Sequence, residues 1–167
     1  MTKLIHREEL NWKGTVYDVE LYEADEFDTL APVTQVQAVL FVTKDQIVIY
    51  KDIDGYYGLP GGSIEPGESL EQALRREVKE ESACEIMDFG PLGFMKNTKK
   101  PGNSVSYQVR YWAQVKLLDE PVHDPCGTAI SREVVSLEEA AEKLKWGERG
   151  KILLKVGLEK FKKFHGQ

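Results

Sequence analysis

Residues 60–84 join a stretch that cannot be helical to a stretch with a strong helical pattern. Pro60, the glycine pair Gly61-Gly62 and the Pro66-Gly67 dipeptide exclude a helix interior before residue 69. From there, with Ser69 as the N-cap, apolar side chains recur at helical spacing at Leu70, Ala73, Leu74 and Val78. The pattern predicts a loop followed by a helix from near Ser69 to around Ser82.

Three glutamates crowd the end of this predicted helix. At about 100° of rotation per residue, Glu77 and Glu81 extend the apolar stripe, and Glu80 lies beside them. The helix dipole disfavours negative charge at a C-terminal end, and unpaired buried carboxylates are costly unless they are neutralised. Arg76 can pair with Glu80 at i,i+4 spacing, but one arginine cannot neutralise three acids.

The chemistry of these side chains favours a hard divalent cation. A solvated acidic helix end is the simplest interpretation of a glutamate-rich helix, but the position of the acids on the core stripe argues against it. Oxygen ligands in this number suit Mg²⁺ or Mn²⁺, whereas zinc favours histidine or cysteine ligands. The helix therefore predicts a magnesium or manganese site at its C-terminal end.

The same residues resemble the Nudix box, the signature of the Nudix hydrolase family. Gly62, Glu68 and the run Arg76–Glu81 match its spacing over residues 62–84, an agreement expected by chance about once in ten million windows. Two positions depart from the pattern. Ala83 stands where the family has glycine, and Cys84 stands where it usually has an aliphatic residue, so we expect an altered helix exit with the acids intact.

The resemblance implies a fold and a reaction. We expect one Nudix domain over residues 1–167, of the α/β class, built as an α/β/α sandwich around a mixed β-sheet. The expected activity is that of a metal-dependent pyrophosphohydrolase, which cleaves a phosphoanhydride bond in a nucleoside diphosphate linked to another moiety, such as a nucleoside triphosphate or a nucleotide sugar. The alternative is a catalytically silent Nudix-like module that binds a nucleotide. The presence of every acid of the box favours the enzyme.

The resemblance also assigns roles within the box. The implied metal ligands are three carboxylates and one backbone carbonyl, those of Glu77, Glu80, Glu81 and Gly61. Arg76 is expected to orient this catalytic set, with Glu68 and Gly62 as structural support. The base that activates water is either a box glutamate or an acid of the irregular loop 118–127. The loop side chains that remain candidates for this base are Glu120, His123 and Asp124.

Two further groups are candidates for substrate binding. Tyr56 or Tyr57, just before the glycine-rich loop, could stack on a nucleobase, although packing of the loop is an equal alternative. Lys99 and Lys100 belong to the only basic cluster near a plausible active site, in a predicted connection over residues 96–103. They could hold a distant phosphate of the substrate, although a solvated turn explains them as well.

Composition narrows the class of partner. A length of 167 residues with 41% hydrophobic content allows one proper core, and 22 basic against 28 acidic side chains give a net charge of −6. This charge argues against binding to a nucleic acid polymer or a membrane and leaves a small-molecule nucleotide as the expected partner. We expect a cytoplasmic protein with Cys84 and Cys126 reduced. Both a monomer and a homodimer stay open.

The remaining pattern predicts strands and two further helices. Strands are expected at residues 15–22, 33–42, 46–50, 86–95, 104–117 and 133–135, with an exposed acidic loop at 23–28. A capping box at Ser136–Glu139 predicts a helix running towards Trp146. The last helix is expected over Gly150–Phe164, with Ile152, Leu153, Val156, Phe161 and Phe164 facing inward.

Overall fold

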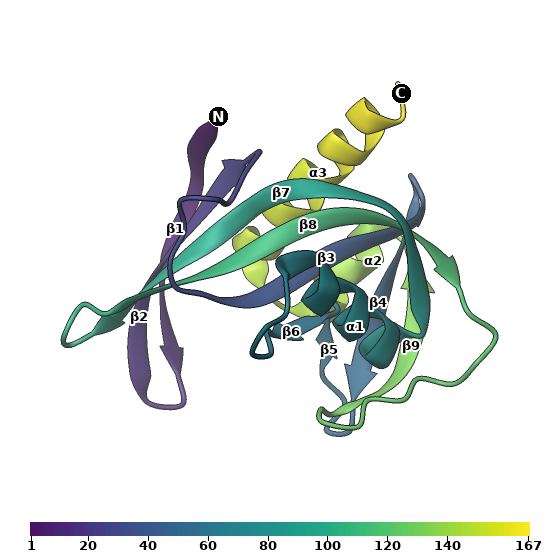
Figure 1. Cartoon of the computed structure of the whole chain (residues 1–167), viewed down its shortest axis with the longest axis horizontal. Helices are drawn as coiled ribbons and strands as arrows, with labels where there is room; N and C mark the ends of the chain where they lie inside the picture. The colour runs from purple at the N-terminus through teal and green to yellow at the C-terminus, as the bar shows by residue number, and fades with distance from the viewer.

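The computed structural model describes residues 1–167, and a nine-stranded mixed sheet forms its centre (Figure 1). The strands are β1 (Thr2–Trp12), β2 (Thr15–Ala24), β3 (Val33–Thr43), β4 (Gln46–Asp52), β5 (Tyr57–Gly58), β6 (Gly61–Ser63), β7 (Cys84–Lys100), β8 (Val105–Leu117) and β9 (Ala129–Val135). The helices are α1 (Leu70–Ser82), α2 (Leu137–Leu144) and α3 (Gly147–Phe164), and none of them is long and apolar enough to cross a bilayer.

The strand order is β1-β2-β7-β8-β3-β4-β5, with β6 paired to β3 and β9 paired to β4. Only β3 and β8 run parallel to one another, and every other pair is antiparallel. One edge of β3 is shared: residues 35–37 pair with β6, and residues 40–43 pair with β4. The glycine-rich loop is thus fixed to the middle of the sheet by β3.

Helices cover both faces of the sheet. Side chains alternate along β3, so that Val36, Ala38 and Leu40 join the core beneath α1, whereas Val39 and Phe41 join the core beneath α2 and α3. In Figure 1, α1 and the two C-terminal helices accordingly lie in different layers, with the sheet between them. This arrangement confirms the predicted α/β/α sandwich with a mixed sheet.

The main departures from the predicted elements are at the N-terminus and in β7. No strand is predicted at residues 2–12, yet β1 forms there as the hairpin partner of β2. The predicted connection at 96–103 is wrong for most of its length, because residues 93–100 pair with β2 and the turn begins only at Pro101. The inward prediction for Phe164 is also wrong, since its side chain lies at the end of α3 and is 57% exposed.

Candidate active site

Helix α1 begins and ends where its sequence predicts. Ser69 is the N-cap and accepts a hydrogen bond from the Gln72 backbone N–H at 3.1 Å, while the Gln72 side chain accepts from the Ser69 N–H at 2.8 Å. At the other end Ala83 adopts the left-handed conformation, with φ 50° and ψ 46°. This is the position where the family pattern has glycine, so the altered exit changes the residue but keeps the left-handed geometry.

The acids at the end of α1 are buried side by side. Glu77 is 9% exposed and Glu81 is 7% exposed, and their carboxyl groups share a hydrogen bond. Burial is the main cause that raises the pKa of Glu81 to about 9, followed by the charge of Glu77, while the backbone N–H of Gly61 opposes the rise. Burial also raises the pKa of Glu80. At neutral pH without a cation, Glu81 therefore holds a proton and donates it to Glu77.

The two box glycines leave no room for a side chain beside this pair. A Cβ atom on Gly62 would lie 2.6 Å from the carboxyl carbon of Glu77, and one on Gly61 would overlap the backbone carbonyl of Val36. Real Cβ atoms do not approach other atoms so closely. Glycine at position 62 is therefore required for β6 to lie against the Glu77 carboxyl group, and glycine at position 61 is required for β6 to lie close to β3.

Arg76 and Glu68 hold the acids from the solvent side. Arg76 binds Glu68 through two parallel contacts, Nε to Oε2 at 2.7 Å and Nη2 to Oε1 at 2.9 Å, and it also donates from Nη1 to Glu77 Oε1 at 2.8 Å. Its contact to Glu80 is longer, at 3.5 Å. The Arg76 hydrogen bonds, with one from the Glu65 backbone N–H, lower the pKa of Glu68 to about 2. This ion pair fixes the direction of Glu77.

Arg132, which is distant in sequence, binds backbone carbonyls at the end of α1, and no sequence pattern predicted this contact. Arg132 of β9 donates hydrogen bonds from Nη1 to the backbone carbonyls of Ser82, at 3.1 Å, and Ala83, and from Nη2 to the carbonyl of Leu118 at 2.9 Å. Two of these carbonyls, those of Ser82 and Ala83, lie at the terminus of α1, where the helix itself provides no donor. The guanidinium thus supplies the positive charge that the dipole at this end of α1 favours. No local spacing links residue 132 to residue 82.

The loop between β8 and β9 brings its candidate bases to the same place. Glu120 and His123 line a cavity of about 300 Å³ together with Glu80 and Lys79. Asp124 lies close enough to raise the pKa of both Glu80 and Glu81, and its Oδ2 accepts a hydrogen bond from the Ala129 N–H at 3.1 Å. All three loop candidates therefore lie near the box acids.

The predicted substrate-binding groups lie farther from the acids. Tyr56 is 69% exposed, and the ring of Tyr57 on β5 lies under the ammonium group of Lys143, 5.0 Å from its centroid. Lys100 is paired with Asp18 of β2 at 2.8 Å, and Lys99 lies opposite Tyr17. The β7–β8 hairpin that carries both lysines lies at the far left of Figure 1, away from α1. The structure therefore does not bring the two lysines to the acids within one chain.

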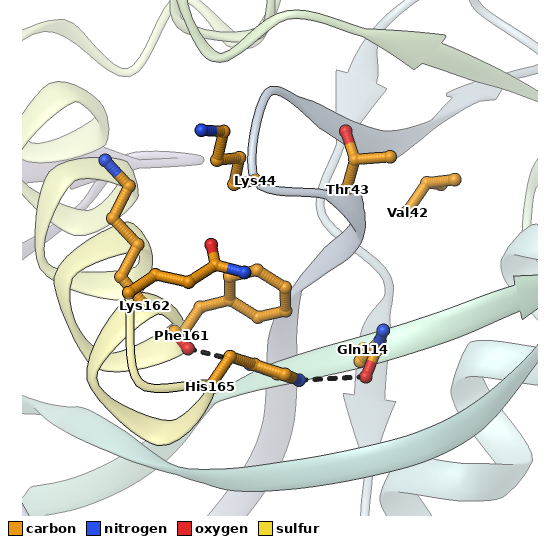
Figure 2. A pocket seen from close by; sticks show the side chains of 8 residues that line it. Val42, Thr43, Lys44, Gln114, Phe161, Lys162 and His165 are labelled. Atoms are coloured by element: carbon orange, nitrogen blue, oxygen red, sulfur yellow. Dashed lines mark hydrogen bonds between the residues drawn. The ribbon is translucent and has the colours of Figure 1, made fainter.

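Another cavity, larger than the one beside Glu80, lies elsewhere. It has a volume of about 510 Å³ and lies between the β3–β4 turn and the end of α3 (Figure 2). His165 lines it, with Nε2 placed 2.9 Å from Gln114 Oε1 and Nδ1 placed 2.8 Å from the Phe161 carbonyl. Lys44 and Lys162 lie at its rim, and no aspartate or glutamate side chain lines it. It shares no residue with the acid cluster.

The acids fit a hard cation by their chemistry. Glu77 and Glu81 provide carboxylate oxygens from which water is largely excluded. Their mutual repulsion is relieved by the proton that Glu81 holds. The three glutamates do not converge on one point, since Glu80 turns towards Arg76. The donor set that is already assembled is the pair Glu77 and Glu81 against β6. A divalent ion would replace the shared proton there.

Comparison with known proteins identifies the family. The family model described as NUDIX domain matches residues 30–156. Nucleoside triphosphatase NudI of Salmonella schwarzengrund (strain CVM19633) is 63% identical over 42 residues, which is 24% of this chain and 30% of that protein. NudI of Enterobacter sp. (strain 638) is 59% identical over 42 residues, with the same coverage. The chain thus matches less than a third of the length of these relatives.

Solved structures share the fold at low identity. The Bacillus subtilis pyrophosphohydrolase BsRppH (E68A mutant) superposes with a TM-score of 0.69 and 20% identity, covering 95% of this chain and 97% of that one. The NUDIX domain of Shewanella oneidensis NrtR, complexed with ADP ribose, gives a TM-score of 0.60 and 21% identity over 83% of this chain and 94% of that one. With the family match over most of its length, the chain belongs to the Nudix hydrolase family.

Proposed function

We propose that this protein is a metal-dependent pyrophosphohydrolase that cleaves a phosphoanhydride bond in a nucleoside diphosphate linked to another moiety. The observation that carries the proposal is the buried Glu77–Glu81 pair, which is held against β6 and shares a proton in the absence of a cation. The similar proteins named as a nucleoside triphosphatase and a pyrophosphohydrolase support this class of reaction.

The residues that would hold Mg²⁺ or Mn²⁺ are Glu77 and Glu81, joined by Glu80 and the Gly61 carbonyl. When bound, such an ion neutralises charge that develops on the non-bridging phosphate oxygens. Arg76 and Glu68 are positioning residues, because their ion pair fixes Glu77. Gly62 supports the site by leaving the space that the Glu77 carboxyl group occupies.

The reaction needs one water molecule and one base. The water oxygen forms a bond to phosphorus, the bridging P–O bond breaks, and the leaving phosphate keeps the electron pair. The proton from the water goes to a carboxylate. Both a box glutamate and the loop acids Glu120 and Asp124 are within the same acidic region and stay open for this role.

We also propose that residues 1–29, which precede the matched segment, belong to the same domain. Strand β2 pairs with β7 over eight successive positions, from Val16 opposite Lys100 to Glu23 opposite Gly93. Val19 and Leu21 of β2 are buried in the same core as Trp112 and Phe161. Residues 1–167 then form a single Nudix domain with a small nucleotide as its substrate.

A substrate panel tests the proposal. Nucleoside triphosphates, nucleotide sugars and ADP-ribose are incubated with Mg²⁺, Mn²⁺ or chelator, and release of phosphate, pyrophosphate and nucleoside monophosphate is measured. We expect turnover with at least one compound, dependence on the metal, and loss of turnover in Glu81→Gln. Saturable nucleotide binding without turnover under any metal condition would overturn the hydrolase and leave the binding module.

A further inference from the structure

Every buried side-chain polar atom that lacks a hydrogen-bond partner lies in one region of the molecule. The five atoms are His6 Nε2, Glu8 Oε1, Gln37 Oε1, Arg110 Nε and Arg149 Nε; Glu8 Oε1 and Arg149 Nε form an ion pair with each other without hydrogen-bond geometry, and the other three have no hydrogen-bond partner. We call their residues the arginine cluster. They come from β1, β3, β8 and α3 and lie on the face of the sheet that α3 covers, opposite to α1. Such atoms are rare in folded proteins, so their gathering in one place requires an explanation.

Within the arginine cluster, one carboxylate compensates one arginine and leaves the other without a counter-ion. Glu8 Oε1 lies 2.6 Å from Arg149 Nε. Both guanidinium groups contact the sulfur of Met95: Arg110 Nη2 lies 3.1 Å from it and Arg149 Nη1 lies 3.6 Å from it. Arg110 forms no ion pair, and its remaining acceptors are neutral: Gln108 Oε1 at 3.0 Å and the Val109 carbonyl at 3.3 Å. The cluster therefore carries one excess positive charge.

Burial makes this excess charge unfavourable. Arg110 is 5% exposed. Desolvation, and after it the charge of Arg149, lowers the pKa of Arg110 to about 9, so the guanidinium is still charged at neutral pH. A buried cation without a counter-ion is stable only when other interactions compensate it. An anion bound between the two arginines would remove the imbalance.

The start of α3 adds further donors on the same side. Trp146 is the N-cap of this helix of 18 residues and makes no side-chain capping hydrogen bond, and Arg149 lies in the first turn. The first backbone N–H groups of a helix lack intrahelical acceptors, and the dipole favours negative charge there. The cluster reaches the surface of the molecule at Glu8 and Arg149, whose side chains keep 27% and 15% exposure.

The arginine cluster is within reach of the box. Gln37 is the link, since it is the register partner of Gly61 in β6 on one side and of Arg110 in β8 on the other. Gly61 and Arg110 are thus two strand spacings apart, roughly 10 Å. Gln37 Nε2 donates to the Leu59 carbonyl at 3.1 Å, which leaves Oε1 as a free acceptor beside Arg110. Register partners carry their side chains on the same face of a sheet, so Gly61 faces the side of Gln37 and Arg110, whereas Gly62 faces Glu77 of α1. A nucleoside diphosphate derivative held at Gly61 can extend over that face as far as Arg110.

We propose that Arg110, with Arg149, binds an oxyanion on the part of the substrate that lies beyond the cleaved phosphoanhydride, and that it selects substrates carrying a phosphate or carboxylate there. The choice of substrate rests on the proposed hydrolase function, whereas the binding of an oxyanion does not. Arg110 is then a specificity-determining residue.

The first arm of the test measures anion binding without catalysis. In chelator, melting of the wild type is followed while inorganic phosphate replaces chloride at constant ionic strength. We expect phosphate to raise the melting temperature, and Arg110→Met to need about tenfold more phosphate or worse for the same rise. Lys44→Met, which removes a lysine of the cavity in Figure 2, is the control and should respond like the wild type.

The second arm measures selectivity. UDP-glucuronate is compared with UDP-glucose, which differ only in a carboxylate on the distal sugar. We expect the wild type to prefer the carboxylate through a lower KM, and Arg110→Met to lose the preference because its KM for UDP-glucuronate rises towards its KM for UDP-glucose. Arg110→Lys retains the charge and should recover part of the preference, which a purely structural role would not predict.

Each outcome decides between readings. Equal phosphate response in the wild type and Arg110→Met, or no response in either, overturns the oxyanion site. If phosphate stabilises the protein through Arg110 but the enzyme does not prefer UDP-glucuronate over UDP-glucose, Arg110 has no role in substrate choice. The cluster is then a site for free anions only. Absence of turnover with all compounds, while the phosphate response depends on Arg110, overturns the hydrolase and not the anion site. If Arg110→Met does not fold, the phosphate response is measured with Arg110→Lys instead. A response of Arg110→Lys equal to that of the wild type contradicts recognition of the anion by the guanidinium.

Discussion

The acid pair at the end of α1 and the arginine cluster under α3 are both buried groups of like charge, and they differ in how the charge is relieved. Glu77 and Glu81 share a proton, which the raised pKa of Glu81 makes available at neutral pH. Arg110 keeps its charge at neutral pH, because even its lowered pKa of about 9 lies above that pH. The shared proton thus reduces the acid pair to a single negative charge until a cation displaces that proton, whereas the arginine cluster depends on an external anion.

The two regions also differ in how the chain builds them. The acids come from consecutive turns of one helix, and the ion pair of Arg76 with Glu68 holds them from the same box. The arginine cluster is assembled from four elements. A site built from one helix leaves a periodic pattern in the sequence, and a site built across strands leaves none.

Removal of Glu81 is expected to have the largest effect. Glu81→Gln replaces a protonated acid by a neutral amide, so in chelator it should melt at the same temperature as the wild type or higher. With Mg²⁺ the order should reverse, because the ion stabilises only the folded wild type. Turnover should fall by about two to three powers of ten, which corresponds to a lost contact of about 3 to 4 kcal/mol.

Glu71→Gln is the matched control for this change. Glu71 is an exposed acid on the same helix, paired with Arg75 at 3.0 Å, and its replacement should leave turnover and the response to Mg²⁺ unchanged. A strong loss of stability of Glu81→Gln in chelator would show that Glu81 is a satisfied structural carboxylate. The difference drawn between the acid pair and the arginine cluster would then fail.

The next largest effect is expected for Arg132. Arg132→Met removes the hydrogen bonds to three backbone carbonyls at the end of α1 and should lower the free energy of unfolding by about 2 to 3 kcal/mol. For a protein of this size the melting temperature should fall by roughly 5 to 10 °C. Lys143→Met, which breaks a half-exposed pair with Glu133, should cost less than about 1 kcal/mol. Equal effects of the two changes would show that the helix end does not depend on Arg132.

The pH dependence of stability in chelator reports on the buried acids at the end of α1. The pKa of Glu81 is about 9 in the folded state, against an ordinary value of 4.5, so the folded protein holds a proton that the unfolded chain releases. Stability should therefore fall as pH rises from about 5 to 9, by up to about 1.4 kcal/mol per pH unit.

Denaturant titrations across this range measure the slope. Glu81→Gln should lack it, and Mg²⁺ should remove it from the wild type, since a cation favours the ionised acids. Glu68 does not interfere, because its pKa of about 2 places its titration below the window. The same slope in Glu81→Gln would assign the pH dependence to another group.

The smallest effect is expected at the helix exit. Ala83→Gly relieves a left-handed alanine, worth about 1 kcal/mol, but it also removes a buried methyl group, worth about 0.8 kcal/mol. The melting temperature should change by less than about 2 °C, with turnover hardly altered. Lys145→Gly is the matched control, since Lys145 ends α2 in the same conformation but is exposed, and it should stabilise by nearly the full 1 kcal/mol. A large fall in turnover of Ala83→Gly would mean that Ala83 shapes the site.

The fold and the acid pair were predictable because their signals are local. Helical spacing and the Ser69 cap place α1 and bury Glu77 and Glu81, and alternation places β3 and β4. Strand β1 was not predictable, because its side chains are mostly polar and exposed and it forms a strand only by pairing with β2. The extent of β7 depends in the same way on β2 as its partner.

The positions of Arg132 and Arg110 in the fold were not predictable, although the sequence around Arg110 is unusual. Arg132 contacts residues 49 and 50 positions earlier, and no spacing rule reaches so far. Arg110 interrupts the otherwise apolar run Val109–Ala113, where a charged side chain is unusual in a buried strand. That interruption marks a special position, but only the register of β3 and β8 shows that it lies beside Gln37.

The parallel pairing of β3 with β8 also determines when the site can form during synthesis. Residues 33–41 leave the ribosome with α1 soon after them, but their parallel partner, residues 107–114, follows much later. Arg132, which holds the end of α1, is later still. Until then the glutamates of a nascent α1 are hydrated and ionised, and only docking onto the completed sheet withdraws them from water. The acidic helix is thus made before β8 and β9, and its carboxyl groups are withdrawn from water only after both strands have been made.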